Sequence, residues 1–279
     1  MSVVEKTLRK IRKSNGCSPD GEKREAAQTS PGQPHQVDLG ALRRTGLAPA
    51  EGDAPPLMAQ YRHIKRPLIA NATARGAQLL PKGRLIVISS AMPGEGKTFT
   101  VVNLARSMSF EKDVHVVLVD ADVAKPQLTR MLGAGDAPGL LDALRTPDLD
   151  PEGTVLATDV PNLSFIPAGT HSAQATELLA SERMALAAEA LLRRDRQRIL
   201  LFDSPPLLLT SESPVLTQIA GQVVLVVRAE STPQPVVLDA LDAVEGEAAV
   251  YLVLNQSTTA ASSYYYGNGQ LRSEAASAS

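Results

Sequence analysis

The sequence contains few aromatic residues and no tryptophan: aromatic side chains make up 3% of its 279 residues. Three of its five tyrosines nevertheless stand side by side, at Tyr264, Tyr265 and Tyr266, in a stretch of Ser, Gly and Asn near the C-terminus. Core-facing residues of a helix or strand are spaced apart along the chain, so three adjacent tyrosines in this setting do not form a core. The cluster therefore points to a function outside the packed interior.

Other absences restrict the class of protein. A single cysteine, Cys17, excludes a disulfide within the chain and suits a reducing cytoplasm. No apolar run approaches the roughly 18 residues of a membrane-spanning helix, and the N-terminal MSVVEKTLRKIRKS lacks the apolar stretch of a signal peptide. The net charge of −2 does not fit a dedicated nucleic-acid binder. These features predict a cytoplasmic protein that binds no nucleic acid.

The two ends of the sequence differ from its middle. Residues 1–13 have the pattern of a short basic helix, which is compatible with contact to anionic lipid or an acidic partner and also with a solvated arm. Residues 14–55 mix Gly, Pro, Ser, Gln and charged residues without periodicity, which predicts a disordered linker. The Ser-, Ala- and Gly-rich composition of residues 256–279 predicts a flexible, tyrosine-bearing tail.

Residues 56–255 alternate short apolar runs with helical patterns, which predicts one domain. The expected strands are RLIVISS (84–90), VHVVLVD (114–120), LSFIPA (163–168), RILLFD (198–203), QVVLVV (222–227) and VYLVLN (250–255). The clearest helical patterns cover residues 175–194 and 55–74, and Pro67 is expected to kink or divide the second. Apolar strands separated by helices indicate a three-layer α/β/α fold with a mostly parallel central sheet.

The first expected strand leads directly into AMPGEGKT, residues 91–98, and then into a helix. This is a P-loop in its strand–loop–helix context, and it predicts the P-loop NTPase fold. Lys97 is expected to reach the β- and γ-phosphates of a nucleotide, and the Thr98 hydroxyl to bind Mg²⁺. The expected nucleotide-binding residues of the loop are Pro93, Gly94, Glu95, Gly96, Lys97, Thr98 and Phe99.

Carboxylates follow two of the expected strands. Asp120 and Asp122 end the second strand and Asp203 ends the fourth, so all three are expected at the sheet edge where ligands bind. One carboxylate near Mg²⁺ and another able to take a proton are the minimum for phosphoryl transfer. Asn255 ends the last strand, where an amide that contacts an adenine edge and a simple turn residue are both compatible with the sequence.

As an ordered set, AMPGEGKT, VVLVDADVAKP and ILLFDSPP, followed by a tyrosine-rich tail, resemble the P-loop bacterial tyrosine kinases. In that family the three are the Walker A, Walker A′ and Walker B motifs. Further stretches are similar to the exosortase-associated tyrosine autokinases of exopolysaccharide gene clusters: YRHIKRPLIANA (61–72), IPAGTHSAQATELLASERM (166–184), GQVVLVV (221–227), VLNQ (253–256) and YYYG (264–267). The similarity covers roughly residues 55–270 and a short N-terminal EKTLRK.

The resemblance implies a tyrosine autokinase that uses ATP and Mg²⁺. Lys97 would hold phosphate, Thr98 and Asp203 would organise Mg²⁺, and Asp120 would lie at the metal and activate the attacking hydroxyl, supported by Asp122. Tyr264–Tyr266 would be the autophosphorylation sites, usually reached by a neighbouring subunit of a homo-oligomer. The implied activator is a separate membrane polysaccharide copolymerase, or chain-length protein, that recruits the kinase to the inner membrane.

The sequence departs from the family pattern in two places. Ala124 replaces the arginine of the family's D-x-D-x-R, with Lys125 beside it, and an ammonium group does not reproduce a planar guanidinium. In the family's oligomerisation helix, E-x-x-R-x-x-R, Arg62 and Lys65 fit the basic positions, whereas Ala59 stands in place of the glutamate.

Three alternatives stay open at this point. A dimeric ATPase switch would carry a signature lysine where this sequence has Met92. A nucleotide-gated regulator without useful kinase activity is compatible with Ala124. The tyrosine cluster itself is also compatible with an unmodified aromatic docking patch.

Overall fold

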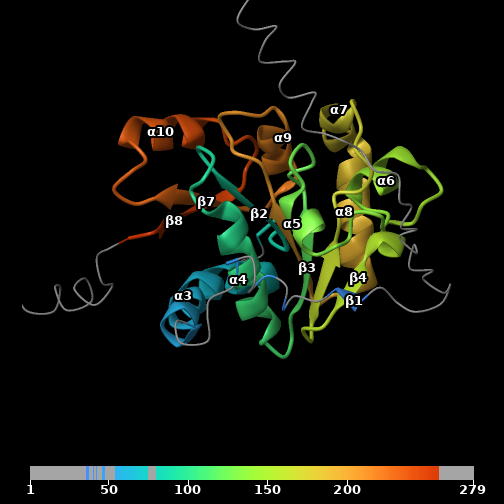
Figure 1. Ribbon diagram of the computed structural model, residues 1–279, viewed down its shortest axis with the longest axis horizontal. Helices are drawn as coiled ribbons and strands as arrows, with labels where there is room; N and C mark the ends of the chain where they lie inside the picture. Colours follow the sequence, from blue (N-terminus) through green and yellow to red (C-terminus); the bar gives the residue numbers. More distant parts are fainter. Residues whose placement is uncertain are drawn as a thin grey trace, which may run out of the picture. The chain divides into compact units, whose positions relative to one another are not determined.

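The computed structural model describes residues 36–37, 40, 42, 46–47, 54–74 and 80–257. These residues build an eight-stranded sheet in the order β1-β4-β5-β3-β6-β2-β7-β8 (Figure 1). Neighbouring strands are parallel except β4 and β5. The strands are β1 (Gln36–Val37), β2 (Leu85–Ser90), β3 (His115–Asp120), β4 (Leu156–Thr158), β5 (Leu163–Ile166), β6 (Arg198–Asp203), β7 (Gln222–Arg228) and β8 (Ala249–Asn255).

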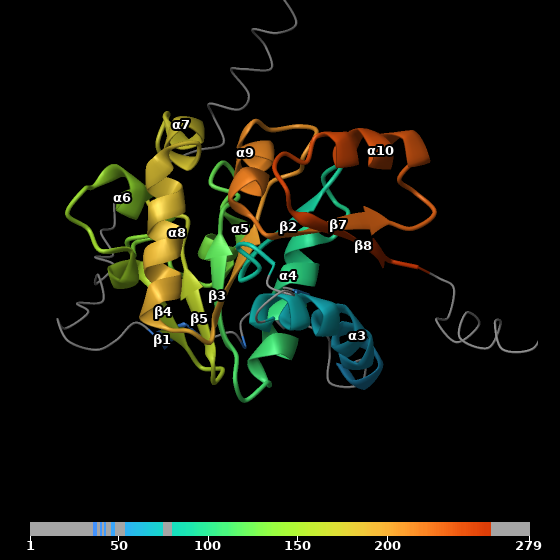
Figure 2. The same cartoon turned by 180° about the vertical axis from the view of Figure 1, so that it is seen from behind.

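Helices cover both faces of the sheet (Figures 1 and 2). Side chains of α3, α4 and α5 pack on one face, and those of α6, α7, α8, α9 and α10 pack on the other. The helices are α3 (Ala54–Thr73), α4 (Lys97–Ser109), α5 (Gln127–Met131), α6 (Leu140–Arg145), the 3₁₀ helix η2 (Pro151–Thr154), α7 (Ala175–Leu179), α8 (Glu182–Arg194), α9 (Glu212–Ile219) and α10 (Gln234–Asp242). The predicted three-layer α/β/α fold with a mostly parallel sheet is confirmed.

Burial explains why the central strands are apolar throughout. All six residues of β2 are buried. Successive side chains of a strand point to opposite faces, and accordingly Ile86 and Ile88 pack with α3 and α4, whereas Leu85 and Val87 pack with the helices behind the sheet. Strand β8 lies at the edge and alternates between half-buried and exposed residues. Its position therefore leaves one of its faces uncovered.

The structure differs from the sequence-based expectation in the helices. The pattern over 175–194 forms two helices rather than one, because Ser181 has an extended backbone and its hydroxyl donates to the Leu178 carbonyl. Pro67 does not divide α3, which continues through it. Buried side chains hold the helix on both sides of this proline, with Tyr61 before it and Leu68 after it. The short strands β1 and β4 were not expected.

Several expectations fall outside the described residues. These are the basic helix over 1–13, most of the linker over 14–55 with Cys17, and the tail from residue 258 with its tyrosines. Within the linker range, Gln36–Val37 pairs with β4, and Leu42 is fully buried. In the described part of the chain, no helix combines the length and the apolar character needed to cross a membrane.

Lys65 holds α3 against α4. Its ammonium group is buried, donates to the Ser107 carbonyl at 2.6 Å and pairs with Glu111 at 2.7 Å. This lysine occupies a basic position of the family's oligomerisation pattern, yet its charge is satisfied within the subunit. Arg62 and Arg66 of the same helix are exposed. Burial of α3 also raises the pKa of Tyr61 to about 12.

We expect Lys65→Ala to lower the free energy of unfolding by about 1–3 kcal/mol, because it leaves the buried Ser107 carbonyl without its donor. Arg66→Ala, one residue away and exposed, is the matched control and should change little. Denaturant unfolding measures both variants. Unchanged stability of Lys65→Ala together with a smaller oligomer in light scattering would instead assign Lys65 to a contact between subunits.

Candidate active site

The loop between β2 and α4 has the backbone of a phosphate cradle. Gly94 and Gly96 take φ values of 80° and 94°, a region that favours glycine. Helix α4 begins at Lys97, so its N-terminal N–H groups and the positive end of its dipole face the loop. Pro93 and Gly94 are exposed, while Thr98 is buried and Phe99 is half-buried. The loop predicted from the sequence is thus positioned to bind an anion.

The buried Glu95 braces this loop. Its carboxylate accepts the Met92 N–H at 2.7 Å and the hydroxyl of Thr232, which lies in the connection from β7 to α10. The Glu95 carbonyl accepts a hydrogen bond from the side-chain amide of Asn255 at 2.8 Å. A Cβ added at Gly96 would collide with that amide. The end of β8 therefore packs directly against the P-loop.

Three adjacent strands bring the predicted carboxylates together. Strands β3, β6 and β2 are neighbours, and Asp120 is the register partner of Asp203. Lys97, at the start of α4, pairs with Asp122 through its Nζ at 3.1 Å from Oδ2. Asp120 Oδ2 accepts both the backbone N–H and the hydroxyl of Thr129, each at 2.8 Å. One sheet edge thus gathers a lysine and three carboxylates.

Burial changes the pKa values of two of these carboxyl groups. It raises the pKa of Asp203 to about 7, against the opposing effects of Lys97 and a hydrogen bond from Thr98, while the negative charges of Asp120 and Asp122 add to the rise. Burial likewise raises the pKa of Asp120 to about 6, although the hydrogen bonds from Thr129 lower it. The two carboxyl groups therefore hold protons more tightly than ordinary aspartates.

Two buried oxygen atoms at this edge have no hydrogen-bond partner: Oδ1 of Asp120 and Oδ1 of Asp203. Unpartnered carboxylate oxygens beside a P-loop fit a hard divalent cation, since Mg²⁺ is commonly held by one or two carboxylates together with phosphates. Among the described residues, no group of three or more His, Cys, Asp or Glu forms a metal cluster. The residues present fit a cation shared with a nucleotide rather than a site made by protein alone.

Two residues that contact the predicted site residues were not expected from the sequence. Thr129 lies nine residues after Asp120, and Thr232 lies far from the loop that it contacts. Neither belongs to a motif, so no signal in the sequence pointed to them. Ala124 and Lys125 are both exposed, and the Lys125 backbone N–H donates to Asp122.

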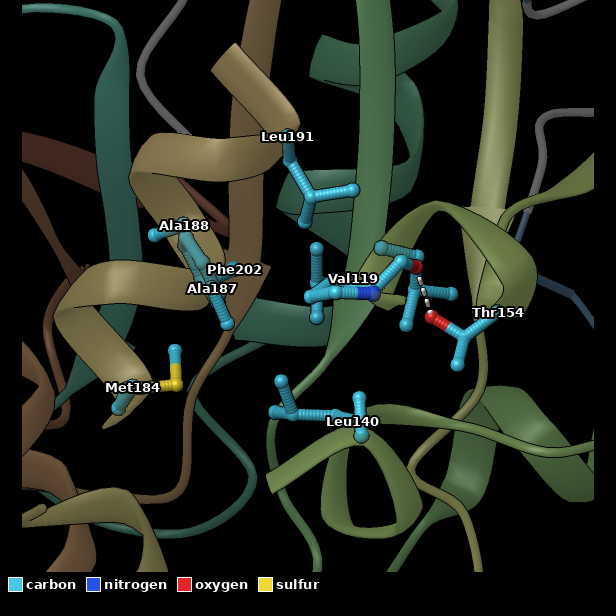
Figure 3. A pocket seen from close by; sticks show the side chains of 11 residues that line it. Val119, Leu140, Thr154, Met184, Ala187, Ala188, Leu191 and Phe202 are labelled. Carbon is cyan, nitrogen blue, oxygen red and sulfur yellow. Dashed lines mark hydrogen bonds between the residues drawn. The ribbon is translucent and has the colours of Figure 1, made fainter. Parts of the chain in front are cut away.

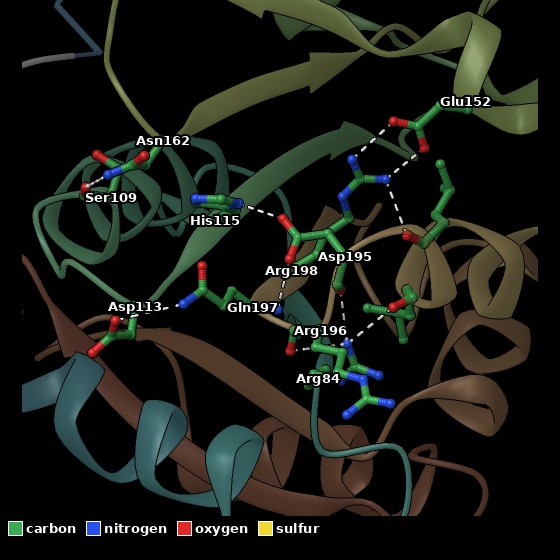
Figure 4. A network of polar contacts seen from close by, with 12 residues as sticks. Arg84, Ser109, Asp113, His115, Glu152, Asn162, Asp195, Arg196, Gln197 and Arg198 are labelled. Atoms are coloured by element: carbon green, nitrogen blue, oxygen red, sulfur yellow. Dashed lines mark hydrogen bonds and ion pairs between the residues drawn. The ribbon is translucent and has the colours of Figure 1, made fainter.

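Two other hollows lie away from this edge. One is an apolar cavity of about 10 Å³ between α8 and the sheet, lined by residues such as Val119, Met184 and Leu191 (Figure 3). A second, of about 300 Å³, lies near the amino ends of β3 and β6. There Asp195 pairs with His115, and Arg198 with Glu152 (Figure 4). Neither contains a residue of the candidate site.

Fold and site together define a P-loop nucleotide-binding domain. The chain belongs to the AAA-domain family, whose model matches residues 83–235, more than half of the chain. The resemblance to bacterial tyrosine kinases is also confirmed. The putative tyrosine-protein kinase EpsB of Ralstonia nicotianae is 36% identical over 146 residues, which cover 52% of this chain and 19% of that protein.

Two further comparisons agree. The succinoglycan biosynthesis transport protein ExoP of Rhizobium meliloti is 31% identical over 163 residues, covering 57% of this chain and 20% of that protein. The solved BceF tyrosine kinase domain superposes with a TM-score of 0.60 at 27% identity, covering 76% of this chain and 86% of that domain. The chain thus matches about a fifth of the length of these two curated relatives and most of the isolated kinase domain.

The raised pKa of Asp203 has a consequence for stability. The folded protein keeps a proton that the unfolded chain releases near pH 3.8, so this group lowers stability as the pH rises from about 4 to 7. The Asp203→Asn variant has no carboxyl group to ionise at this position, so it does not lose this stability as the pH rises. In nucleotide-free protein with chelator, we expect the variant to gain on the order of a few kcal/mol over the parent at pH 8 and little at pH 4.

Denaturant unfolding at both pH values measures the effect, and Asp136→Asn, at an exposed position, is the control. An equal change at pH 4 and pH 8 would show that the pKa of Asp203 in the folded protein is not raised above its value in the unfolded chain.

Proposed function

We propose that this chain is an ATP- and Mg²⁺-dependent protein-tyrosine autokinase that phosphorylates its own cluster at Tyr264–Tyr266. The observation that carries the proposal is the convergence of Lys97, Asp120 and Asp203 beside the P-loop, with an unpartnered oxygen on each of the two aspartates. The family's kinase members support the choice of a tyrosine hydroxyl as the acceptor.

Each side chain has a defined task in this proposal. Lys97 binds the β- and γ-phosphates and gives up its contact with Asp122 to do so. Thr98 and the unpartnered oxygen of Asp203 would hold Mg²⁺, which would supply charge neutralisation at the transferred phosphoryl group. Asp120, oriented by Thr129, accepts the proton of the attacking hydroxyl.

The start of the tail is well placed for this reaction. Asn255 contacts the P-loop, so the chain leaves β8 beside the phosphate site. Tyr264 follows nine residues later, and nine residues of fully extended chain span at most about 30 Å. That reach includes the P-loop of the same subunit, and we propose a homo-oligomer in which it extends to the site of a neighbour. A tyrosine hydroxyl, with a pKa near 10, still needs the base and metal to react.

The setting of the reaction is part of the same proposal. ExoP is by its name a succinoglycan biosynthesis transport protein, and this relationship supports a role in exopolysaccharide synthesis or export. The chain matches only a fifth of that relative's length. From the family resemblance we propose a separate membrane copolymerase as activator and as the means of recruitment to the inner membrane.

A second candidate is a nucleotide-gated regulator without useful kinase activity. It is favoured by Ala124, which stands where kinases of this family carry an arginine. In the described part of the chain, the side chain of the adjacent Lys125 is exposed and forms no ion pair that would replace that arginine's contacts. Under this hypothesis ATP binds tightly and the tail stays unmodified.

Lys97→Met and Asp203→Ala should each reduce autophosphorylation at least about 100-fold, because each removes charge stabilisation from the transferred phosphoryl group. Intact-mass and peptide mass spectrometry, with and without ATP·Mg²⁺, measures the phosphate on Tyr264–Tyr266. Lys125→Met, an exposed lysine near the same edge, is the matched control. An unphosphorylated tail on parent protein that binds ATP tightly would favour the regulator.

Asp120→Ala separates binding from transfer. It removes the proposed base but leaves Lys97 and the loop in place, so the transfer rate should fall about 100-fold or more, while nucleotide affinity measured by calorimetry changes little. Loss of ATP·Mg²⁺ binding together with retained binding of ATP alone would instead give Asp120 a metal role.

A further inference from the structure

The edge strand β8 presents an uncovered apolar face. Val250, Leu252 and Leu254 have exposed fractions of 39%, 54% and 69%, whereas Tyr251 and Val253 pack toward α3 and α4. We call these three exposed residues the β8 strip. Alternate residues of a strand share a face, so the strip is continuous and runs along the whole strand.

The backbone edge of β8 is open as well. Within the described residues β8 pairs only with β7 and lies at the outer side of the sheet (Figures 1 and 2). An edge strand that carries unpaired N–H and C=O groups and exposed apolar side chains is a template for another extended segment. The open edge of β8 can therefore bind a further extended segment.

Charge restricts what the edge can bind. From residue 229 to residue 257 the sequence contains no Lys, Arg or His. The same stretch carries five acidic residues: Glu230, Asp239, Asp242, Glu245 and Glu247. Arg228, an exposed residue of β7, is the register partner of Asn255 at the carboxyl end of β8. Strand β8 itself carries no charged residue, so its apolar strip favours an uncharged apolar or aromatic segment over a charged one.

The segment that follows β8 in the chain meets these conditions. It begins where the strand ends, and Gln256 has a φ of 57°, a left-handed conformation suited to starting a reverse turn. Residues 258–272 contain no acidic residue and include the three adjacent tyrosines. A segment tethered at the end of the strip binds at a high effective concentration, which a separate partner lacks.

We propose that the unmodified tail folds back along β8, pairs with its open edge and places tyrosine side chains on the β8 strip. In three adjacent residues of an added strand, at least one side chain faces the strip, because successive side chains point to opposite faces. A turn over 256–259 leaves the tyrosines beside the amino end of β8. That position is about 20 Å from the carboxyl end of the strand, where the P-loop lies.

This docking gives the tyrosines two states, a consequence that rests on the proposed autokinase function. Docked, they are held away from the phosphate site. Once phosphorylated, each would carry about −1.5 to −2 charges, and burying such a charge against the apolar β8 strip is unfavourable. The modified tail would therefore stay released, so the surface recognises only the unmodified tail.

Hydrogen exchange followed by mass spectrometry tests the docking. The parent is the full chain carrying Lys97→Met, without nucleotide, so its tail is unmodified whether or not the chain is a kinase. Amides of residues 258–266 should exchange about tenfold slower in this parent than in the same protein with Leu252→Thr and Leu254→Thr. Threonine keeps the preference for a strand and removes the apolar contact.

Leu186→Thr on α8 is the matched control, since Leu186 has an exposed fraction of 51%, and it should keep the slow exchange. Replacing all three tyrosines by glutamate should abolish the protection. Equally fast exchange in the parent and the double variant would overturn the proposal. Protection that disappears on dilution, together with a dimer in light scattering, would assign the strip to a second copy and also overturn it.

The result is independent of the kinase test. Slow tail exchange in a protein whose wild type never gains phosphate would reject the autokinase and keep the docking. A wild type that gains phosphate, together with fast tail exchange in the Lys97→Met parent, would support the autokinase and reject the docking.

Discussion

The site depends on carboxylates that are buried at the end of a parallel sheet. Asp120 and Asp203 lie side by side at the ends of β3 and β6, and burial raises the pKa of both. Such a pair is unfavourable in an isolated protein, because each charge is removed from water and faces another of the same sign. Lys97 and the P-loop dipole offset part of this cost. Under the proposed function, a divalent cation bound together with a nucleotide would offset the remainder.

Sequence patterns were sufficient for the sheet and for the motifs. Strands β2, β3 and β6 are buried on both faces, so their apolar runs were unambiguous, and the P-loop and the three aspartates follow directly from them. The shorter strands β1 and β4 have two and three residues, too few for any periodicity to be detected. The division between α7 and α8 depends on the backbone of one serine, which a helical pattern does not encode.

Contacts between segments that are distant in the chain could not be predicted from the sequence. Thr129 orients Asp120 from helix α5, and Thr232 holds Glu95 from the connection between β7 and α10; only the folded chain brings these residues together. Lys65 shows the converse case. Its place in a family pattern suggested a contact between subunits, whereas in the structure its ammonium group contacts Ser107 and Glu111 of the same subunit. A motif identifies which residue types are present. Packing decides which partner each of them has.

The hydrogen bond from Asn255 to the Glu95 carbonyl joins the last strand to the phosphate loop. Edge strands open locally more readily than central ones, and an opening of β8 would remove one of the supports of the loop. The two elements are therefore coupled through this contact, although they lie far apart in the sequence. Any ligand that orders the loop must also reduce the fraying of β8, and the local free energy of opening at the strand becomes a measure of occupancy at the nucleotide site.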